Sequence, residues 1–261
     1  MYKTQGAIKF NEAEVSGVKF TILDKFSYRE FMTHVGQIGF RVCVVNARAL
    51  YSAQHDKSYK ELLNSASIVV SDGVPIYKIL KWRGYRDLMR KRGIDLFFDF
   101  LSDRDIAEKK HLFLGTNIET LRKVREALKA GGLLPEQAMF EPLPYGDTET
   151  VLSELDLTKI QNFAPDVVWV SLGAPKQDVI GRYLHQQIGF ATVAGVGLVF
   201  DYVAGNVRKP PEFVSRMGFE WLFRIFTQTK RTVFFIKPFF FILGELIQAG
   251  VKNLVGKKGE R

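Results

Sequence analysis

The chain has 261 residues, 46% of them hydrophobic and 25% charged, and this composition excludes a wholly disordered protein. Its 37 Lys and Arg residues against 28 Asp and Glu residues give a net charge of +9, which indicates anionic partners such as nucleotide phosphates, phospholipid headgroups or nucleic acid. The single cysteine, Cys43, excludes a disulfide framework and favours a reducing compartment, and residues 1–16 lack the apolar core expected of a signal peptide.

The first half of the chain predicts strands that alternate with helices. Apolar, β-branched runs indicate strands at 18–23, 41–45 and 68–70. Ser27 and Glu30 form a capping box for a helix that reaches about Gln37. Two further helical stretches follow, at 47–64 in two pieces around His55 and Asp56, and at 76–82.

The second half repeats this alternation. Strands are predicted at 111–114, 167–172 and 191–196. Thr116 and Glu119 form a capping box for a helix that stops at Gly131, and further helices are predicted at 148–163 and after Gln177. Strands that alternate with helices require crossover connections, so we predict an α/β fold with a mostly parallel sheet and helices on both of its faces.

Polar residues or glycines follow four of these strands: Asn46, Asp72, Gly115 and Gly173. In open α/β sheets, ligands bind outside the carboxyl ends of the strands. Each residue also has a simpler interpretation, since Asp72 could cap the next helix and the glycines could form tight turns. The recurrence of such residues at four strand ends favours a ligand cleft, in which the N–H groups of Gly115 and Gly173 could meet phosphates.

Two charged stretches have competing interpretations. The segment 81–92 is rich in Lys and Arg, which usually indicates a solvated face, but beside a cleft it would attract phosphate. Asp103 and Asp105 flank Arg104 in a D-x-D pattern, which could suggest a manganese site. Because they lie in a charged run, we interpret them as solvated surface.

The character of the chain changes after residue 205. A basic turn at 204–211 and a stretch of helical spacing at 213–231 precede an aromatic segment at 233–251. Lys237, Pro238 and Glu245 interrupt this segment, so it is a poor candidate for a spanning helix. We predict that it lies in the interface of an anionic membrane, with a core-packed helix pair as the alternative. The predicted organisation is a sheet domain at 1–205 and a membrane-associating appendage at 206–261.

An ordered set of motifs resembles the WecG/TagA/CpsF glycosyltransferases, family 26. The resemblance covers about residues 18–231, and its motifs are Asn46, Asp72-Gly73, Arg90 with Gly93-Ile94-Asp95, the segment 173–178 and the segment 218–224. It implies a Rossmann-like fold of the GT-E type, inversion at the anomeric carbon, and neither a metal requirement nor a cofactor. It also implies transfer of one sugar from a nucleotide diphospho-sugar to a polyprenyl-diphosphate-linked saccharide.

The resemblance also assigns roles to residues. Asp72 resembles the general base, which an inverting transfer needs to take the proton of the acceptor hydroxyl. Gln177 and Asn46 match polar pocket residues whose amides could fix sugar hydroxyls. Without a metal, arginines must neutralise the departing diphosphate. The candidate substrate-binding residues are Asn46, Gly73, Arg90, Gly115, Gly173, Gln177, Arg208, Arg216, Arg224 and Arg231.

Two departures from the family pattern concern the donor. Val44 stands where members often carry Thr, and Asp178 replaces the usual Glu after the glutamine. Both changes leave the identity of the transferred sugar open.

The leading hypothesis is a UDP-sugar-dependent hexosyltransferase of bacterial cell-surface or exopolysaccharide synthesis, peripheral at the cytoplasmic face of the plasma membrane, with self-association into a homo-oligomer left open. A non-catalytic nucleotide-sugar or lipid-binding protein of the same fold is the alternative. Nucleic-acid binding is disfavoured, because no recognised motif accompanies the positive charge.

Overall fold

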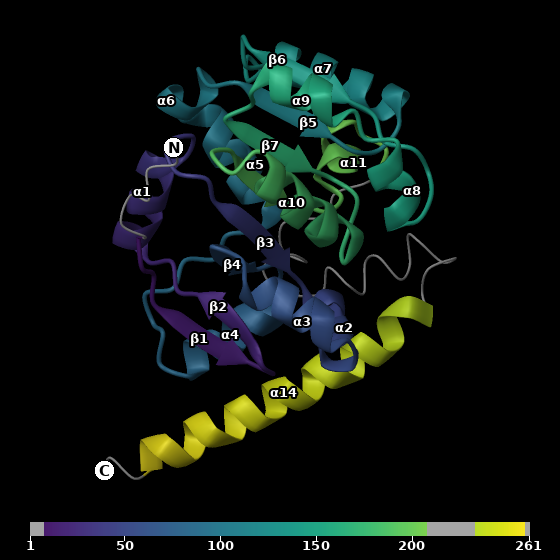
Figure 1. The fold of residues 1–261 in the computed structure, drawn as a ribbon. Helices are drawn as coiled ribbons and strands as arrows, with labels where there is room; N and C mark the ends of the chain where they lie inside the picture. Colours follow the sequence, from purple (N-terminus) through teal and green to yellow (C-terminus); the bar gives the residue numbers. More distant parts are fainter. Residues whose placement is uncertain (1–7, 208–232, 259–261) are drawn as a thin grey trace.

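A computed structural model describes residues 8–207 and 233–258, which form an α/β fold around a six-stranded parallel sheet (Figure 1). The strand order is β4-β3-β8-β7-β5-β6, and every neighbouring pair is parallel. The strands are β3 (Arg41–Val45), β4 (Ile68–Ser71), β5 (His111–Leu114), β6 (Ala138–Glu141), β7 (Val167–Val170) and β8 (Thr192–Gly195). The predicted Rossmann-like α/β class is therefore confirmed.

Helices cover both faces of the sheet, as crossover connections require. One face carries α1 (Lys25–His34), α5 (Gly93–Ser102), α6 (Arg104–Ala107), α7 (Ile118–Ala130) and α11 (Val199–Val203). The other carries α2 (Ala47–His55), α3 (Lys57–Asn64), α4 (Val74–Trp82), α8 (Thr148–Ser153), α9 (Leu157–Phe163) and α10 (Lys176–Gln187). An antiparallel hairpin of β1 (Glu12–Val15) and β2 (Val18–Thr21) lies beside β4.

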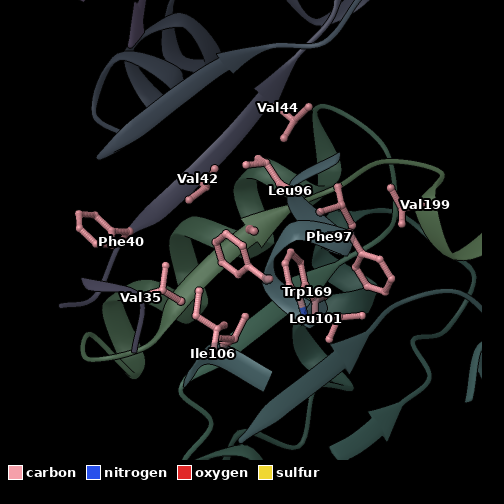
Figure 2. Packing of buried hydrophobic residues seen from close by; sticks show 14 of the residues in the cluster. Val35, Phe40, Val42, Val44, Leu96, Phe97, Leu101, Ile106, Trp169 and Val199 are labelled. Carbon is pink, nitrogen blue, oxygen red and sulfur yellow. The ribbon is translucent and has the colours of Figure 1, made fainter. Parts of the chain in front are cut away.

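The core consists of an apolar layer on each side of the sheet. Figure 2 shows the layer beneath α5, where Leu96, Phe97 and Leu101 pack against Trp169 of β7. The rings of Phe97 and Trp169 meet edge to face at 5.0 Å between centroids. Full burial of such a side chain contributes about 1.5–3 kcal/mol. This packing holds the sheet rigid, so the loops at its ends start from fixed positions.

Several predicted boundaries are wrong for reasons of local chemistry. Helix α1 begins after Asp24, whose carboxylate accepts the N–H groups of Phe26 and Ser27, so Asp24 and not Ser27 is the N-cap. Asn117 caps α7 instead of Thr116. The helix predicted over 148–163 is divided into α8 and α9 by a new cap at Asp156. The strand predicted at 18–23 is β2, but the sequence patterns missed its hairpin partner β1, as well as α5 and edge strand β6.

The last described element is the long helix α14 (Val233–Lys258), which lies across α2 and α4 (Figure 1). Ile242 and Ala249 are buried against these helices, and the ring of Phe241 packs on Tyr51. One face of the aromatic segment is therefore packed on the body of the protein. In residues 8–207 and 233–258, no helix is both long enough and apolar enough to cross a membrane.

Candidate active site

The carboxyl ends of the parallel strands meet at one edge of the sheet, and the predicted strand-end residues lie there. Asn46 follows β3, Asp72 follows β4, Gly115 follows β5, and Gly173 lies shortly after β7. Backbone bonds continue the sheet register past the strand ends, from the N–H of Asp72 to the carbonyl of Val45 at 2.9 Å and from Ser171 to Leu114 at 3.0 Å. The predicted gathering of these residues at one edge is confirmed, while their roles in binding stay predictions.

Asp72 and Asn46 leave the sheet side by side, because β3 and β4 pair Val45 with Ser71. Asp72 is partly exposed, and the N-cap of α4 is the next residue, Gly73, with a φ of +103°. Asp72 therefore does not occupy the cap position that the simpler interpretation gave it. Asn46 does cap a helix, since its Oδ1 accepts the N–H of Ala49 at 3.0 Å. A hydrogen bond from Asn46 to a ligand hydroxyl would therefore come from its Nδ2 group.

The two glycines that were expected to offer N–H groups to phosphate offer them to the protein instead. Gly115 donates to the carbonyl of Glu141 at 3.1 Å, and Gly173 donates to the side chain of Gln177 at 3.1 Å. Neither N–H is available to a phosphate in this state. Gly115 has a different structural role, since a Cβ there would lie 2.7 Å from the carbonyl oxygen of Ser171. Only glycine allows the β5 and β7 loops to approach this closely.

Gln177 and Ser171 connect the loops that follow β7 and β8. Gln177 is buried, at 2% exposure, and its Oε1 also accepts the N–H of Gly197 at 2.8 Å. Ser171 donates its hydroxyl to the carbonyl of Gly197 at 2.5 Å. Neither Gly197 nor Ser171 is among the candidate site residues that the sequence predicts. Both matter because β7 and β8 are neighbours in the sheet.

Arg90 lies in a segment that is anchored on both sides. The N–H of Met89 bonds to the carbonyl of Leu23 at 2.7 Å, and a Cβ on Gly93 would lie 2.9 Å from the carbonyl oxygen of Val196, just after β8. The Lys91 ammonium lies 2.5 Å from the Asp99 carboxylate. The approach of Gly93 to Val196 places this segment near the end of β8, at the carboxyl edge of the sheet.

Part of the positive charge in the segment 81–92 is neutralised by helix α5. The Arg92 guanidinium binds the Asp95 carboxylate through two nitrogens, at 2.7 and 2.9 Å. Burial would raise the pKa of Asp95, but its hydrogen bonds with Arg92 leave it below its usual value. Because Lys91 and Arg92 are both paired with acids of α5, neither behaves as part of a solvated basic face.

Four predicted phosphate ligands, Arg208, Arg216, Arg224 and Arg231, lie outside the described residues. Asp103 of the D-x-D pattern is the N-cap of α6, where its carboxylate accepts the N–H of Ile106 at 3.2 Å. Within the part of the chain that the structure describes, no group of three or more His, Cys, Asp or Glu residues could hold a metal ion.

Comparison with known proteins agrees with the family resemblance of the sequence motifs. Residues 14–253 match the model of the glycosyl transferase WecG/TagA/CpsF family. The chain is 28% identical to a protein of Bacillus spizizenii named N-acetylglucosaminyldiphosphoundecaprenol N-acetyl-beta-D-mannosaminyltransferase, over 83% of this chain and 78% of the relative. Proteins of the same name from Bacillus subtilis and Staphylococcus aureus are 24% and 27% identical, over 72% and 69% of both chains respectively.

Proposed function

Because the chain belongs to the WecG/TagA/CpsF family of glycosyltransferases, we propose that it transfers one sugar from a UDP-sugar to a polyprenyl-diphosphate-linked saccharide, with inversion and without a metal ion. The relatives' names specify an acceptor of this class, N-acetylglucosaminyldiphosphoundecaprenol, and a β-linked product. The reaction would belong to bacterial cell-surface or exopolysaccharide synthesis. The same names favour a modified hexose, N-acetylmannosamine, as the first donor sugar to test.

The observation that carries this proposal is the position of Asp72. Asp72 is a partly exposed residue at the carboxyl edge of a buried strand, next to Asn46 and outside the cap position of α4. An inverting transfer needs one base, which takes the proton of the acceptor hydroxyl as that oxygen attacks the anomeric carbon. We assign that role to Asp72. Asn46 would orient a sugar hydroxyl by hydrogen bonding.

Departure of the nucleoside diphosphate places negative charge on the leaving oxygen. Guanidinium groups stabilise such charge through paired, charge-assisted hydrogen bonds. Arg90 is the candidate among the described residues, since its segment is fixed beside the end of β8. Arg208, Arg216, Arg224 and Arg231 are proposed to share this role.

A protein that acts on a polyprenyl acceptor must reach the membrane surface. Helix α14 carries a second apolar face, formed by Ile236, Phe240, Leu243, Ile247 and Val251, which are 37–65% exposed. At 3.6 residues per turn, this stripe lies within an arc of about 80°, opposite the packed residues Ile242 and Ala249. An exposed apolar face on a chain of net charge +9 suits an anionic bilayer, so we propose peripheral attachment through α14 at the cytoplasmic face of the plasma membrane.

The test of the reaction is Asp72→Asn. We expect the variant to bind UDP-sugar as the wild type does, while kcat falls about 10²- to 10⁴-fold, because the amide cannot accept the proton. The measurement is the release of UDP in the presence of a lipid-linked acceptor. Asp105→Asn, an exposed acid on α6, is the matched control and should behave as the wild type. A wild-type protein that binds UDP-sugars but never releases UDP would favour the non-catalytic alternative.

A further inference from the structure

One buried side chain joins the two loops at the centre of the sheet's carboxyl edge. Gln177 lies in the first turn of α10, and its Oε1 accepts the N–H of Gly173 after β7 at 3.1 Å and that of Gly197 after β8 at 2.8 Å. An amide oxygen has two lone pairs, and these two backbone donors use both. At 2% exposure, the side chain also offers little surface to a ligand.

Strand β8 is shaped to receive this side chain. A Cβ on Gly195 would lie 3.0 Å from Nε2 of Gln177, 3.1 Å from Cδ and 3.2 Å from Cγ, all closer than ordinary contact. The missing side chain at Gly195 therefore creates the space that Gln177 fills. The strand supplies both this space and, two residues later, one of the bound N–H groups.

The two glycines that Gln177 binds have open space beside their backbone. Gly173 and Gly197 have φ values of +83° and +68°, and no heavy atom of the described residues lies within 4 Å of the position that a Cβ would take. Glycine is the usual residue where a backbone must adopt such a φ or lie close to a ligand. The hydrogen bond from Ser171 to the carbonyl of Gly197 fixes the second loop from another direction.

We propose that Gln177 is a positioning residue, which holds the β7 and β8 loops in the conformation that receives the nucleotide sugar. This role differs from the sugar contact that the family resemblance implied, because the amide oxygen is already occupied by two backbone donors. The inference rests on the proposed function in assuming that these loops line the donor site. Loss of Gln177 would then weaken donor binding without removing the Asp72 base.

The first test needs no substrate. In Gln177→Met, which keeps the length of the side chain but removes the acceptor, we expect the amides of Gly173 and Gly197 to exchange with deuterium on the order of 10-fold faster, as measured by NMR. Gln177→Glu keeps an acceptor oxygen and should retain slow exchange. Gln186→Met, an exposed position on the same helix, is the matched control and should leave both amides unchanged.

The second test is kinetic. Gln177→Met should raise KM for the nucleotide sugar at least 10-fold, with KM for the lipid-linked acceptor unchanged, and Gln177→Glu should restore the donor KM. Unchanged exchange at both glycines in Gln177→Met, together with lost activity, would overturn the proposal in favour of a direct substrate contact.

If Gln177→Met does not fold, Gly195→Ala tests the same contact from the strand and should accelerate deuterium exchange at the same two amides. Because exchange is measured on the free protein, it remains decisive even if no UDP-sugar is turned over.

Discussion

His111, the first residue of β5, is a buried histidine whose hydrogen bonds require the neutral ring. Its Nδ1 accepts the indole N–H of Trp169 at 3.1 Å, and its Nε2 lies 2.8 Å from the carbonyl oxygen of Ile106, to which it donates. A protonated ring would direct a second N–H at the indole N–H. Burial accordingly lowers the pKa of His111 to about 4. This residue serves the core and has no part in the proposed chemistry.

This depressed pKa predicts a loss of stability in mild acid. As the pH falls below 6.5, His111 becomes protonated in the unfolded chain, whereas in the native state it stays neutral down to about pH 4. The free energy of unfolding should therefore decrease as the pH falls through this range. One pKa unit corresponds to about 1.36 kcal/mol, so the whole loss is on the order of 3 kcal/mol. Urea unfolding at pH 7, 5.5 and 4.5 measures it.

The control for this prediction is a second histidine. His111→Gln should be less stable than the wild type at pH 7 but should lose less stability on acidification. His55→Gln, at an exposed position at the end of α2, should retain the pH dependence of the wild type. If the free energy of unfolding fell equally with pH in the wild type and in His111→Gln, His111 would not be the source of the acid sensitivity.

Asp178, next to Gln177, is a buried acid to which the proposed mechanism assigns no role. Tyr59 donates its hydroxyl to Oδ2 at 2.7 Å, whereas Oδ1 is buried without a hydrogen-bond partner among the described residues. Burial raises the pKa of Asp178 to about 6. It also raises the pKa of the neighbouring Cys43 thiol, which stays protonated. The shorter acid at this position thus contacts Tyr59 of α3 and lies beside Cys43 of β3.

At the scale of an element, α14 has two apolar faces. One is packed on α2 and α4 through Ile242 and Ala249, and the Arg83 guanidinium lies 3.9 Å from the Glu245 carboxylate beside this contact. The opposite face, which includes Phe240 and Ile247, is exposed. A helix that is apolar all round is normally buried on all sides. The exposed face is therefore available to the membrane surface that we propose as its partner.

Substitution on the exposed face should separate membrane attachment from folding. We expect Phe240→Ser combined with Ile247→Ser to reduce co-sedimentation with vesicles that contain anionic phospholipid by at least about 10-fold, because full burial of each side chain contributes about 1.5–3 kcal/mol. The melting temperature should change little, since neither side chain is in the core. Gln248→Ser, exposed on the same helix, is the matched control.

Two outcomes would contradict membrane attachment through α14. Unchanged vesicle binding of the double variant would assign attachment to another part of the chain. A change from dimer to monomer in sedimentation, with vesicle binding retained, would show that a second copy of the chain covers the exposed face.

At the scale of the whole molecule, the strand order divides the site into two parts. Asp72 and Asn46 follow the adjacent strands β4 and β3, whereas Gly173 follows β7, three strand spacings or roughly 14 Å from β4. The β8 loop, with Gly197, lies between them. We infer that the donor extends along this edge, with its reactive sugar toward Asp72 and its nucleotide toward the glycine loops.

A donor bound across these loops should stabilise the fold. At a concentration 100 times its Kd, a UDP-sugar adds about 2.7 kcal/mol to the free energy of unfolding, which raises the melting temperature of a chain of this size by roughly 5–10 °C. A panel of UDP-sugars read by thermal shift also ranks the donors. The shift should be the same in EDTA and in Mn²⁺ if arginines alone neutralise the diphosphate. A shift that requires Mn²⁺ would refute metal independence.

The sequence by itself determined five of the six strands of the sheet, all but β6, and the positions of several candidate residues. Apolar runs identified every central strand, and the residue after each run marked the edge where Asn46 and Asp72 lie. These features are local, because the hydrophobic pattern of consecutive residues shows which strand residues are buried. The order of the motifs along the chain was also sufficient to identify the family.

The tertiary structure alone decided how the strand ends are combined. No local pattern indicates that β8 inserts between β3 and β7, and only this order brings Gly197 beside Gly173, so that one buried amide can bind both. The patterns likewise missed β6, whose ladder partner β5 is more than twenty residues away in the chain. The role of a polar side chain such as Gln177 depends on which groups the fold places around it, and those groups come from distant parts of the sequence.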